Sequence, residues 1–318
     1  MLKLYLAIPC YNEQEVLPDS AEKLLRKFRQ LMSDGKISDD SRIVFIDDGS
    51  RDGTWDIIEK LHGAEKIFDG IKMSRNRGHQ NALLGGLMTL RGKADAVISL
   101  DADLQDDINA IDLMIEKYEQ GCDIVYGVRS SRKSDSFFKR FTAEGYYKIL
   151  NKMGAKVIFN HADFRLMSDR ALEEFSKFHE VNIFLRGLVP MIGLKSDIVE
   201  YERKERLAGE SKYPLKKMLA LAWEGITSLS VRPLRFITVT GICAFLVSIG
   251  MLIYFLIRYF TGHTVAGWAS LAVSIWALGG LQLLAMGILG EYLGKIYLEA
   301  KQRPRFIVEK ILSDEDEK

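Results

Sequence analysis

Short apolar runs alternate with helically spaced segments up to about residue 200. The runs that indicate buried strands lie at 4–8, 42–46, 70–73, 96–100 and 123–126. Between them, apolar residues recur at three- and four-residue steps, which predicts helices over 16–32, 55–61, 80–90 and 108–118. Because strands that alternate with helices indicate βαβ units, we expect an α/β fold with a mostly parallel sheet covered on both faces.

Two long apolar runs follow this region, at 236–257 and 265–290, and neither contains a charged residue. Each exceeds the roughly 20 residues that cross a bilayer as a helix, so we predict two transmembrane helices rather than buried core helices. Basic residues are sparse in the connector between the runs and common on both flanks of the pair. They are Lys216, Lys217, Arg232 and Arg235 before the first run, and Lys295, Lys301, Arg303 and Arg305 after the second. The positive-inside rule therefore places both ends in the cytoplasm.

An amphipathic segment at 213–235 leads into the first apolar run, with basic residues on its polar side. We expect it to lie on the membrane surface, and packing against the preceding domain is the alternative. We therefore expect the chain to divide into an α/β domain (1–212), a juxtamembrane helix (213–235), membrane helices (236–257, 265–290) and a cytosolic tail (291–318). Glycines in both membrane runs allow close packing within the pair or between subunits, so a homo-oligomer is among the expected partners.

The 318 residues carry 44 Lys and Arg against 43 Asp and Glu, which argues against a nucleic-acid binder. The three cysteines have no metal-ligand spacing, so neither a disulfide framework nor a cysteine metal site is expected. No signal peptide is expected at the N-terminus, because the first residues lead straight into a strand.

Asp101-Ala102-Asp103 directly follows the fourth predicted strand. The carboxyl ends of parallel strands form the ligand-binding edge of an α/β sheet. On an extended strand, side chains two residues apart share one face, so both carboxylates could bind one divalent cation and bridge it to phosphate oxygens. The alternative is that one of these residues caps the following helix.

Polar side chains also follow the first three predicted strands. In chain order these candidates are Pro9, Tyr11, Asn12, Glu13, Asp47, Asp48 and Arg75. The first segment could hold a base and ribose, or it could be a turn in which Asn12 caps the next helix. One aspartate of the second could accept a hydrogen bond from a base N–H, and Arg75 could bring a guanidinium to a diphosphate.

The motifs Pro9-x-Tyr11-Asn12-Glu13, Asp47-Asp48-Gly49-Ser50, Asp101-Ala102-Asp103-Leu104-Gln105 and Gly209-Glu210-Ser211-Lys212-Tyr213 resemble those of the family 2 glycosyltransferases of GT-A fold. More narrowly, nearly the whole chain resembles the polyprenyl-phosphate glycosyltransferases, a group that includes dolichyl-phosphate mannose synthase. The bactoprenol glucosyltransferases of bacteria, which end in two membrane helices, are the most similar type. The resemblance implies an integral protein of the bacterial cell membrane.

The resemblance implies a role for each candidate. Pro9, Tyr11, Asn12, Glu13, Asp47, Asp48, Arg75 and Ala102 would bind the nucleotide sugar, with Arg206 and Lys212 on a mobile loop. Asp101 and Asp103, with Gln105, would hold Mg²⁺ or Mn²⁺ and the diphosphate. Arg129 and Arg132 would bind the acceptor phosphate, or else form a solvated basic loop near anionic lipid headgroups.

The implied reaction is a single inverting transfer of a hexose to undecaprenyl phosphate. That acceptor is already anionic, so no strong base is needed, and cationic side chains with a metal would bring the two anions together. Asp163 matches a position that acts as a base or orients the sugar; we favour orientation, and pairing with Arg165 is the structural alternative. The resemblance to the two-span bacterial members implies UDP-glucose as the donor. UDP-N-acetylglucosamine stays the alternative, because no motif in the sequence encodes the sugar. A processive polysaccharide synthase and a non-catalytic membrane scaffold are remote alternatives.

Overall fold

The computed structural model describes residues 1–130, 161–180, 184–202, 227, 231–261 and 267–314. The chain separates into two compact units. One contains a β-sheet and the helices that cover it, including residues 303–318 at the end of the chain. The other contains the long helices α9 and α10.

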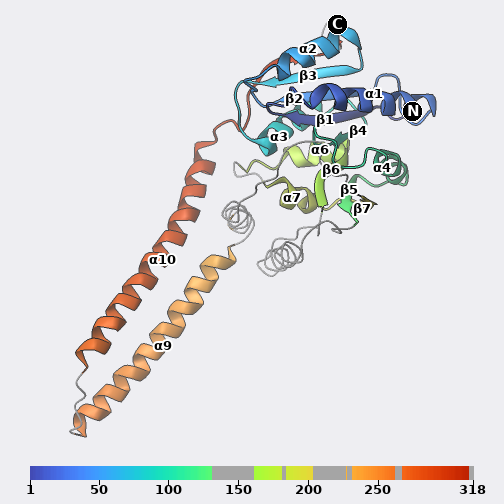
Figure 1. The fold of residues 1–318 in the computed structure, drawn as a ribbon. Coiled ribbons are helices and arrows are strands. Elements are labelled where there is room, and N and C mark those ends of the chain that lie inside the picture. The colour runs from blue at the N-terminus through green and yellow to red at the C-terminus, as the bar shows by residue number, and fades with distance from the viewer. Residues whose placement is uncertain (131–160, 181–183, 203–226, 228–230, 262–266, 315–318) are drawn as a thin grey trace. The chain divides into compact units, whose positions relative to one another are not determined.

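Among the described residues of the first unit, eight strands form one sheet in the order β7-β5-β6-β4-β1-β2-β3-β8 (Figure 1). The strands are β1 (Leu4–Cys10), β2 (Arg42–Asp47), β3 (Phe68–Met73), β4 (Ala96–Ser99), β5 (Ile124–Arg129), β6 (His161–Ser168), β7 (Ser196–Tyr201) and β8 (Val308–Leu312). All except β6 and β8 run in one direction, since β6 is antiparallel to β4 and β5, and β8 is antiparallel to β3. The prediction of a mostly parallel sheet is confirmed.

Helices cover both faces of this sheet. They are α1 (Leu17–Ser33), α2 (Thr54–Ala64), α3 (His79–Leu90), α4 (Ala110–Glu119), α6 (Asp169–Ser176) and α7 (Leu185–Leu188), which runs into a 3₁₀ turn at Val189–Ile192. On one face, Leu6 of β1 lies in the same core cluster as Leu24 of α1 and Ile111 of α4. On the other, α3 lies so close to β2 that a Cβ added at Gly86 would be 2.0 Å from Ile46 Cδ1.

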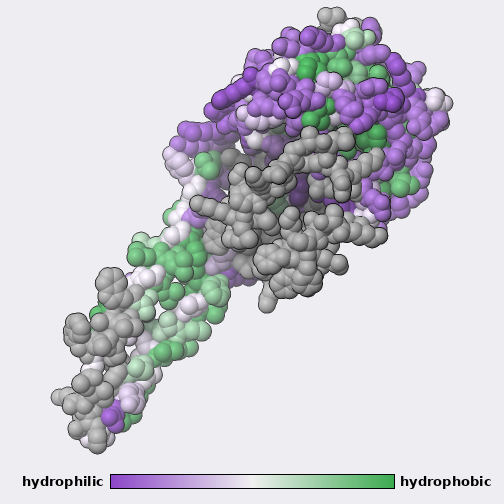
Figure 2. Space-filling model, in the orientation of Figure 1, coloured by the Kyte–Doolittle hydropathy of each residue, from purple (hydrophilic) through white to green (hydrophobic). Residues whose placement is uncertain are grey.

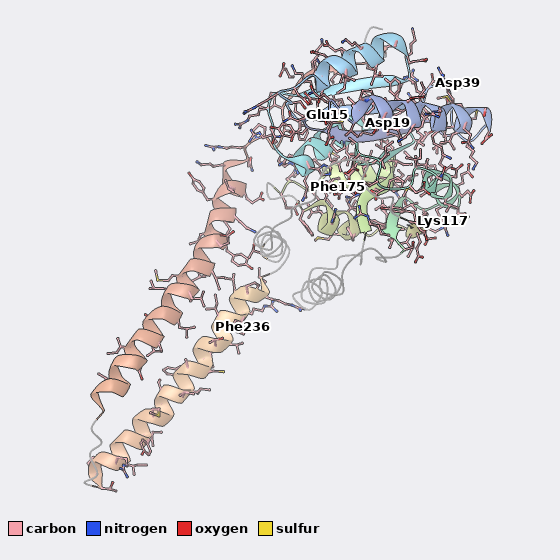
Figure 3. The ribbon with its side chains drawn as sticks, viewed as in Figure 1. Glu15, Asp19, Asp39, Lys117, Phe175 and Phe236 are labelled. Atoms are coloured by element: carbon pink, nitrogen blue, oxygen red, sulfur yellow. The ribbon has the colours of Figure 1, made fainter. Side chains whose placement is uncertain are left out.

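Local sequence explains where these elements begin and end. Every residue of β1 is buried, as expected for an apolar central strand covered on both faces. Helix α1 begins with a proline in its first turn and carries Asp19 there, which complements the positive end of the helix dipole (Figure 3). It ends just before Gly35, whose φ of +69° suits a residue without a Cβ.

The last strand, β8, was not anticipated from the sequence, which assigned residues 291–318 to a tail. It pairs antiparallel with β3 and forms an edge of the sheet. Arg305, just before this strand, donates hydrogen bonds to the carbonyl oxygens of Phe178 (3.0 Å) and Glu180 (3.3 Å). The chain therefore returns to the sheet after its second long helix.

The second unit contains α9 (Arg232–Phe260) and α10 (Trp268–Lys301), which contact one another (Figure 1). Both are long and apolar enough to cross a membrane, and none of the apolar window in either is buried. Apolar residues make up much of the coloured surface of these helices in Figure 2, and Phe236 of α9 (Figure 3) is 72% exposed. An apolar surface of this extent indicates association with a membrane. Helix α10 continues past residue 290, the expected end of its membrane run. Of the predicted juxtamembrane helix, residues 213–226 and 228–230 lie outside the described residues, and α9 begins within its last part, at Arg232.

Candidate active site

The sheet topology brings the predicted site residues to one edge. The strand order reverses at β1, because β2 and β3 lie on one side of it and β4 on the other. In an open α/β sheet the crevice at such a reversal, outside the carboxyl ends of the strands, is where ligands bind. The candidate motifs follow the carboxyl ends of β1, β2, β3 and β4.

The loop after β1 is fastened to the loop after β2. The Asn12 N–H donates to Ser50 Oγ (2.9 Å), and Asn12 Oδ1 accepts the Arg51 N–H (2.9 Å). The Glu13 N–H donates to Thr54 Oγ1 (2.9 Å). Asn12 therefore joins two loops and does not cap α1, whose N-cap residue makes no side-chain hydrogen bond. Tyr11, between the strand and these bonds, is 40% exposed.

The two aspartates at the end of β2 are buried, and burial raises the pKa of both. Asp48 accepts the backbone N–H of Arg77 at Oδ1 (2.8 Å) and that of Gly78 at Oδ2 (2.9 Å). It therefore anchors the loop after β3, and a base contact would use a remaining lone pair. Asp47 Oδ1 accepts the Ser50 N–H (3.1 Å), and within the described part of the chain its Oδ2 has no hydrogen-bond partner.

Gly49 allows the loops after β2 and β3 to touch. Its φ is +68°, and an added Cβ would lie 2.7 Å from the carbonyl carbon of Arg75. The Arg75 side chain itself is exposed at this edge. The loops after β1, β2 and β3 thus form one connected surface at the carboxyl ends of the strands.

Asp101 and Asp103 lie in a turn and not on an extended strand, so the expectation that a strand places both on one face was wrong. Strand β4 ends at Ser99, and the Leu104 N–H donates to the Asp101 carbonyl oxygen (3.3 Å). Neither aspartate caps a helix, because α4 begins later, at Ala110. Buried Ala102 between them is held by a bond from Ser20 Oγ to its carbonyl oxygen (2.7 Å).

Negative charge is concentrated around Asp101. Burial raises the pKa of Asp101, His79 opposes that rise, and three further carboxylates add to it: Asp163, Asp106 and Asp103. Asp101 is nevertheless 40% exposed at its side chain. Gln105 is buried, and its N–H donates to Asp103 Oδ1 (3.3 Å). A partly exposed carboxylate such as that of Asp101 suits a divalent cation with oxygen ligands.

Asp163, near the start of β6, is the centre of a second group of charges. It accepts Arg165 Nη2 at Oδ1 (2.7 Å), and Arg186 binds both of its oxygens through Nε (3.3 Å) and Nη2 (3.1 Å). Burial would raise the pKa of Asp163, but the Arg186 guanidinium and the other positive partners hold that pKa well below its usual range. The pairing with Arg165, considered from the sequence, is present.

His79 connects the two groups. Its Nε2 lies 3.6 Å from Asp101 Oδ1 and 3.6 Å from Asp163 Oδ2. Burial lowers the pKa of His79, but the carboxylates outweigh burial and raise the pKa above its ordinary value. The sequence did not reveal this role of His79 or that of Arg186. The sequence did contain a feature that could have drawn attention to His79, because this residue begins the helix that follows a candidate loop. Arg186, on α7, belongs to no motif.

Arg129 is engaged within the protein. It donates to Asp106 Oδ1 through Nε (3.3 Å) and Nη2 (3.1 Å), and the Tyr201 hydroxyl donates to the same oxygen (2.7 Å). Burial lowers the pKa of Arg129, but Asp106 and Tyr201 outweigh burial, and the pKa lies above its ordinary value. The sequence predicted Arg129 as a ligand of the acceptor phosphate; in this structure it pairs with Asp106, and its side chain is 25% exposed. The other predicted cations, Arg132, Arg206 and Lys212, lie outside the described residues.

Comparison with known proteins identifies the family of the chain. The model of the family "Glycosyl transferase family 2" matches residues 5–176, more than half of the chain. The uncharacterized glycosyltransferase YkoT of Bacillus subtilis is 52% identical, covering 96% of this chain and 91% of its own length. The bactoprenol glucosyl transferase of Shigella phage SfII is 42% identical, covering 97% and 98%. Among solved structures, a mannosyl-3-phosphoglycerate synthase from Rubrobacter xylanophilus is 17% identical, with a TM-score of 0.49 over 74% of both chains. The chain belongs to glycosyl transferase family 2 and is a glycosyltransferase.

Proposed function

We propose that this enzyme transfers a hexose from a nucleotide sugar to a polyprenyl phosphate at a membrane, with inversion at the sugar. UDP-glucose is the proposed donor and undecaprenyl phosphate the proposed acceptor. One observation carries the proposal. The same chain has carboxylates at the point where the strand order of the sheet reverses and two exposed apolar helices that are long enough to cross a membrane. The full-length similarity to a protein named bactoprenol glucosyl transferase supports it.

The connected loops after β1, β2 and β3 form the proposed nucleotide site. Pro9, Tyr11, Asn12, Glu13, Asp47, Asp48 and Arg75 are its proposed members, with Ala102 beside them. Tyr11 is exposed enough to stack on a base, and Asp47 Oδ2 is an acceptor without a partner within the described residues. Arg75 is exposed and could reach a diphosphate.

Asp101 and Asp103, with Gln105, are the proposed ligands of Mg²⁺ or Mn²⁺. The fit rests on the turn after β4, which carries the partly exposed Asp101 together with Asp103, whose carboxylate accepts the Gln105 backbone N–H. Within the described residues no group of three or more His, Cys, Asp or Glu side chains is assembled as a metal site, so the two carboxylates would share the cation with the diphosphate. When bound, the metal supplies positive charge that stabilises the departing nucleoside diphosphate.

The residues of the chain suit an acceptor that needs no base. Asp163 is a poor proton acceptor, because its pKa lies well below the usual range. A phosphate monoester does not require one, since it is already an anion, and we therefore propose that Asp163 orients groups in the site. Arg129, Arg132, Arg206 and Lys212 remain the proposed phosphate ligands, and Arg129 pairs with Asp106 in this structure.

The proposed topology places the catalytic domain (1–212), the tail (291–318) and both termini on the cytoplasmic side. The juxtamembrane helix (213–235) would lie on the surface, and the two spans would lie within α9 and α10. The charge asymmetry between the flanks and the connector supports this orientation.

The test incubates membranes containing the protein with undecaprenyl phosphate, Mg²⁺ and labelled UDP- and GDP-sugars. We expect label from UDP-glucose in the organic phase, dependent on added lipid phosphate; UDP-N-acetylglucosamine is the alternative donor that the same panel tests. Asp103→Asn should abolish transfer and leave the protein in the membrane. Asp197→Asn, which removes a carboxylate paired with Lys117 (Figure 3) at 2.7 Å on an edge strand, is the matched control and should stay active. No organic-phase label with any sugar would refute the proposal.

A further inference from the structure

Asp163 is the centre of a group of charged side chains near Asp101. Its carboxylate receives hydrogen bonds from two guanidiniums, those of Arg165 and Arg186. Because arginines stay protonated in proteins, both guanidiniums are fixed positive charges at this edge of the sheet.

The two arginines differ in exposure. The side chain of Arg165 is 2% exposed, whereas that of Arg186 is 37% exposed. Arg186 is therefore accessible from solvent, whereas Arg165 is not. Asp163 binds the Arg186 guanidinium through both carboxylate oxygens, which sets the plane of the fork.

The position of Arg186 is set by the same helix that carries His79. Leu185, its neighbour on α7, donates its N–H to Gln80 Oε1 (3.0 Å), and Gln80 lies in the first turn of α3. The Leu185 carbonyl oxygen accepts Arg165 Nη1 (3.4 Å). The turn that carries Arg186 is thus fastened from two sides.

Arg186 also lies close to the proposed metal ligands. His79 Nε2 is 3.6 Å from Asp101 and 3.6 Å from Asp163, the carboxylate that holds Arg186. A phosphate held at the Asp101 side of the crevice would therefore have the Arg186 guanidinium nearby. Arg129, the cation expected from the sequence, pairs with Asp106 at 3.1 Å.

We propose that Arg186 binds a phosphate oxygen of the reacting substrates and that Asp163 is its positioning residue. This inference rests on the proposed function. The phosphate belongs either to the donor diphosphate or to the lipid phosphate acceptor, and the chemistry of recognition is the same: a charge-assisted, fork-shaped contact.

The test measures transfer by the full-length Arg186→Gln protein with each substrate varied while the other is saturating. We expect kcat/KM to fall about 10- to 100-fold, as for a lost hydrogen bond between charged groups. A raised KM for the UDP-sugar assigns the phosphate to the donor, and a raised KM for undecaprenyl phosphate assigns it to the acceptor. Arg186→Lys, which keeps the charge without the fork, should recover part of the loss.

Arg91→Gln is the matched control, because Arg91 is 39% exposed and pairs with Glu173 (3.5 Å). It should leave both KM values unchanged. The thermal unfolding temperature is measured for every variant, and if Arg186→Gln does not fold, Arg186→Lys is compared with the wild type instead. A folded variant that keeps kcat and both KM values within twofold of the wild type overturns the proposal.

A double-mutant cycle tests the positioning role of Asp163. If Asp163 acts through Arg186, Asp163→Asn should raise the same KM, and the double variant should lose no more than Arg186→Gln alone. Losses that multiply would overturn the positioning role.

Calorimetric titration with UDP-glucose and Mn²⁺ separates this inference from the proposed function. If the wild-type protein transfers no sugar to lipid phosphate, the proposed function fails. In that case weaker UDP-glucose binding by Arg186→Gln would still support the inference, and equal binding would overturn it.

Discussion

At the scale of single residues, the site depends on side chains and backbone that hold loops together as much as on those that face a ligand. Both carboxylate oxygens of Asp48 accept hydrogen bonds from backbone N–H groups of the loop after β3. Asn12 joins the loops after β1 and β2. Such bonds pre-organise a site, so their loss should weaken binding even where no ligand contact is removed.

Gly49→Ala tests this connection between loops. The added methyl would meet the backbone of Arg75 and Asn76 at 2.7 Å, at a φ of +68°. We expect a loss of about 2–4 kcal/mol in stability and weaker UDP binding, because neither backbone nor φ can relax cheaply. Gly35→Ala is the control: its φ is +69° but nothing lies within 4 Å, so it should lose only about 1 kcal/mol. Equal losses at both positions would contradict the close contact of the loops.

Asp112 predicts a pH dependence of stability. It pairs with Lys27, which is buried, and with Lys36 (2.9 Å). Burial raises the pKa of Asp112, but the two lysines lower it below the ordinary value. Because the folded-state pKa is depressed, the stabilisation is present above the unfolded-state pKa, about 4, and is lost as the pH falls through the folded-state value.

Asp112→Asn should therefore lower the free energy of unfolding by about 2 kcal/mol at pH 7, a figure reduced because Asp112 is partly exposed. In thermal unfolding the difference from the wild type should shrink below about pH 4. Asp39→Asn, an exposed aspartate (Figure 3), should change little at either pH. A difference that grows in acid would refute the assignment.

At the scale of elements, the sequence predicted the strands and helices of the first half well, because their apolar periods are clear. The ends of β1 to β4 could be recognised as a site because parallel strands share one edge. The grouping of Asp163, Arg186 and His79 could not be recognised from the sequence. It depends on β6 lying antiparallel beside β4 and on the hydrogen bond that joins the short α7 to α3. No local pattern encodes such pairings.

Strand β8 was missed for a similar reason: it is short and is separated from its partner β3 by most of the chain. Phe306, just before it, packs against α3, since a Cβ added at Gly85 would lie 3.0 Å from its ring. Phe306→Ala should lower the stability of the sheet unit by about 1–2 kcal/mol, because the ring is only partly buried. The thermal unfolding temperature measures this, with Ile307→Ala, at a side chain that is 50% exposed, as the smaller control. Equal shifts would mean that Phe306 does not anchor the segment.

At the scale of the whole molecule, a glycosyltransferase unit and a pair of apolar helices share one chain. A lipid phosphate is confined to the bilayer surface, so an enzyme that uses one benefits from being anchored there. After α10 the chain continues into β8, which pairs with β3, so the chain connects the two units both before α9 and after α10.

Cysteine labelling tests the proposed orientation. Cys10 and Cys122 are buried, so a Cys243→Ser background removes the exposed thiol. In intact cells a membrane-impermeant maleimide should label Thr264→Cys in the connector. It should label Asp314→Cys only after the cells are permeabilised. The opposite pattern would place the catalytic unit outside.

The most direct measurement uses the purified protein in lipid nanodiscs with UDP-[¹⁴C]glucose, undecaprenyl phosphate and Mg²⁺. We predict that label enters the lipid in proportion to the undecaprenyl phosphate supplied, stops when EDTA removes the metal and resumes when Mg²⁺ is restored. Label that enters the lipid without a lipid phosphate acceptor, or that ignores EDTA, would contradict a metal-dependent transfer to polyprenyl phosphate.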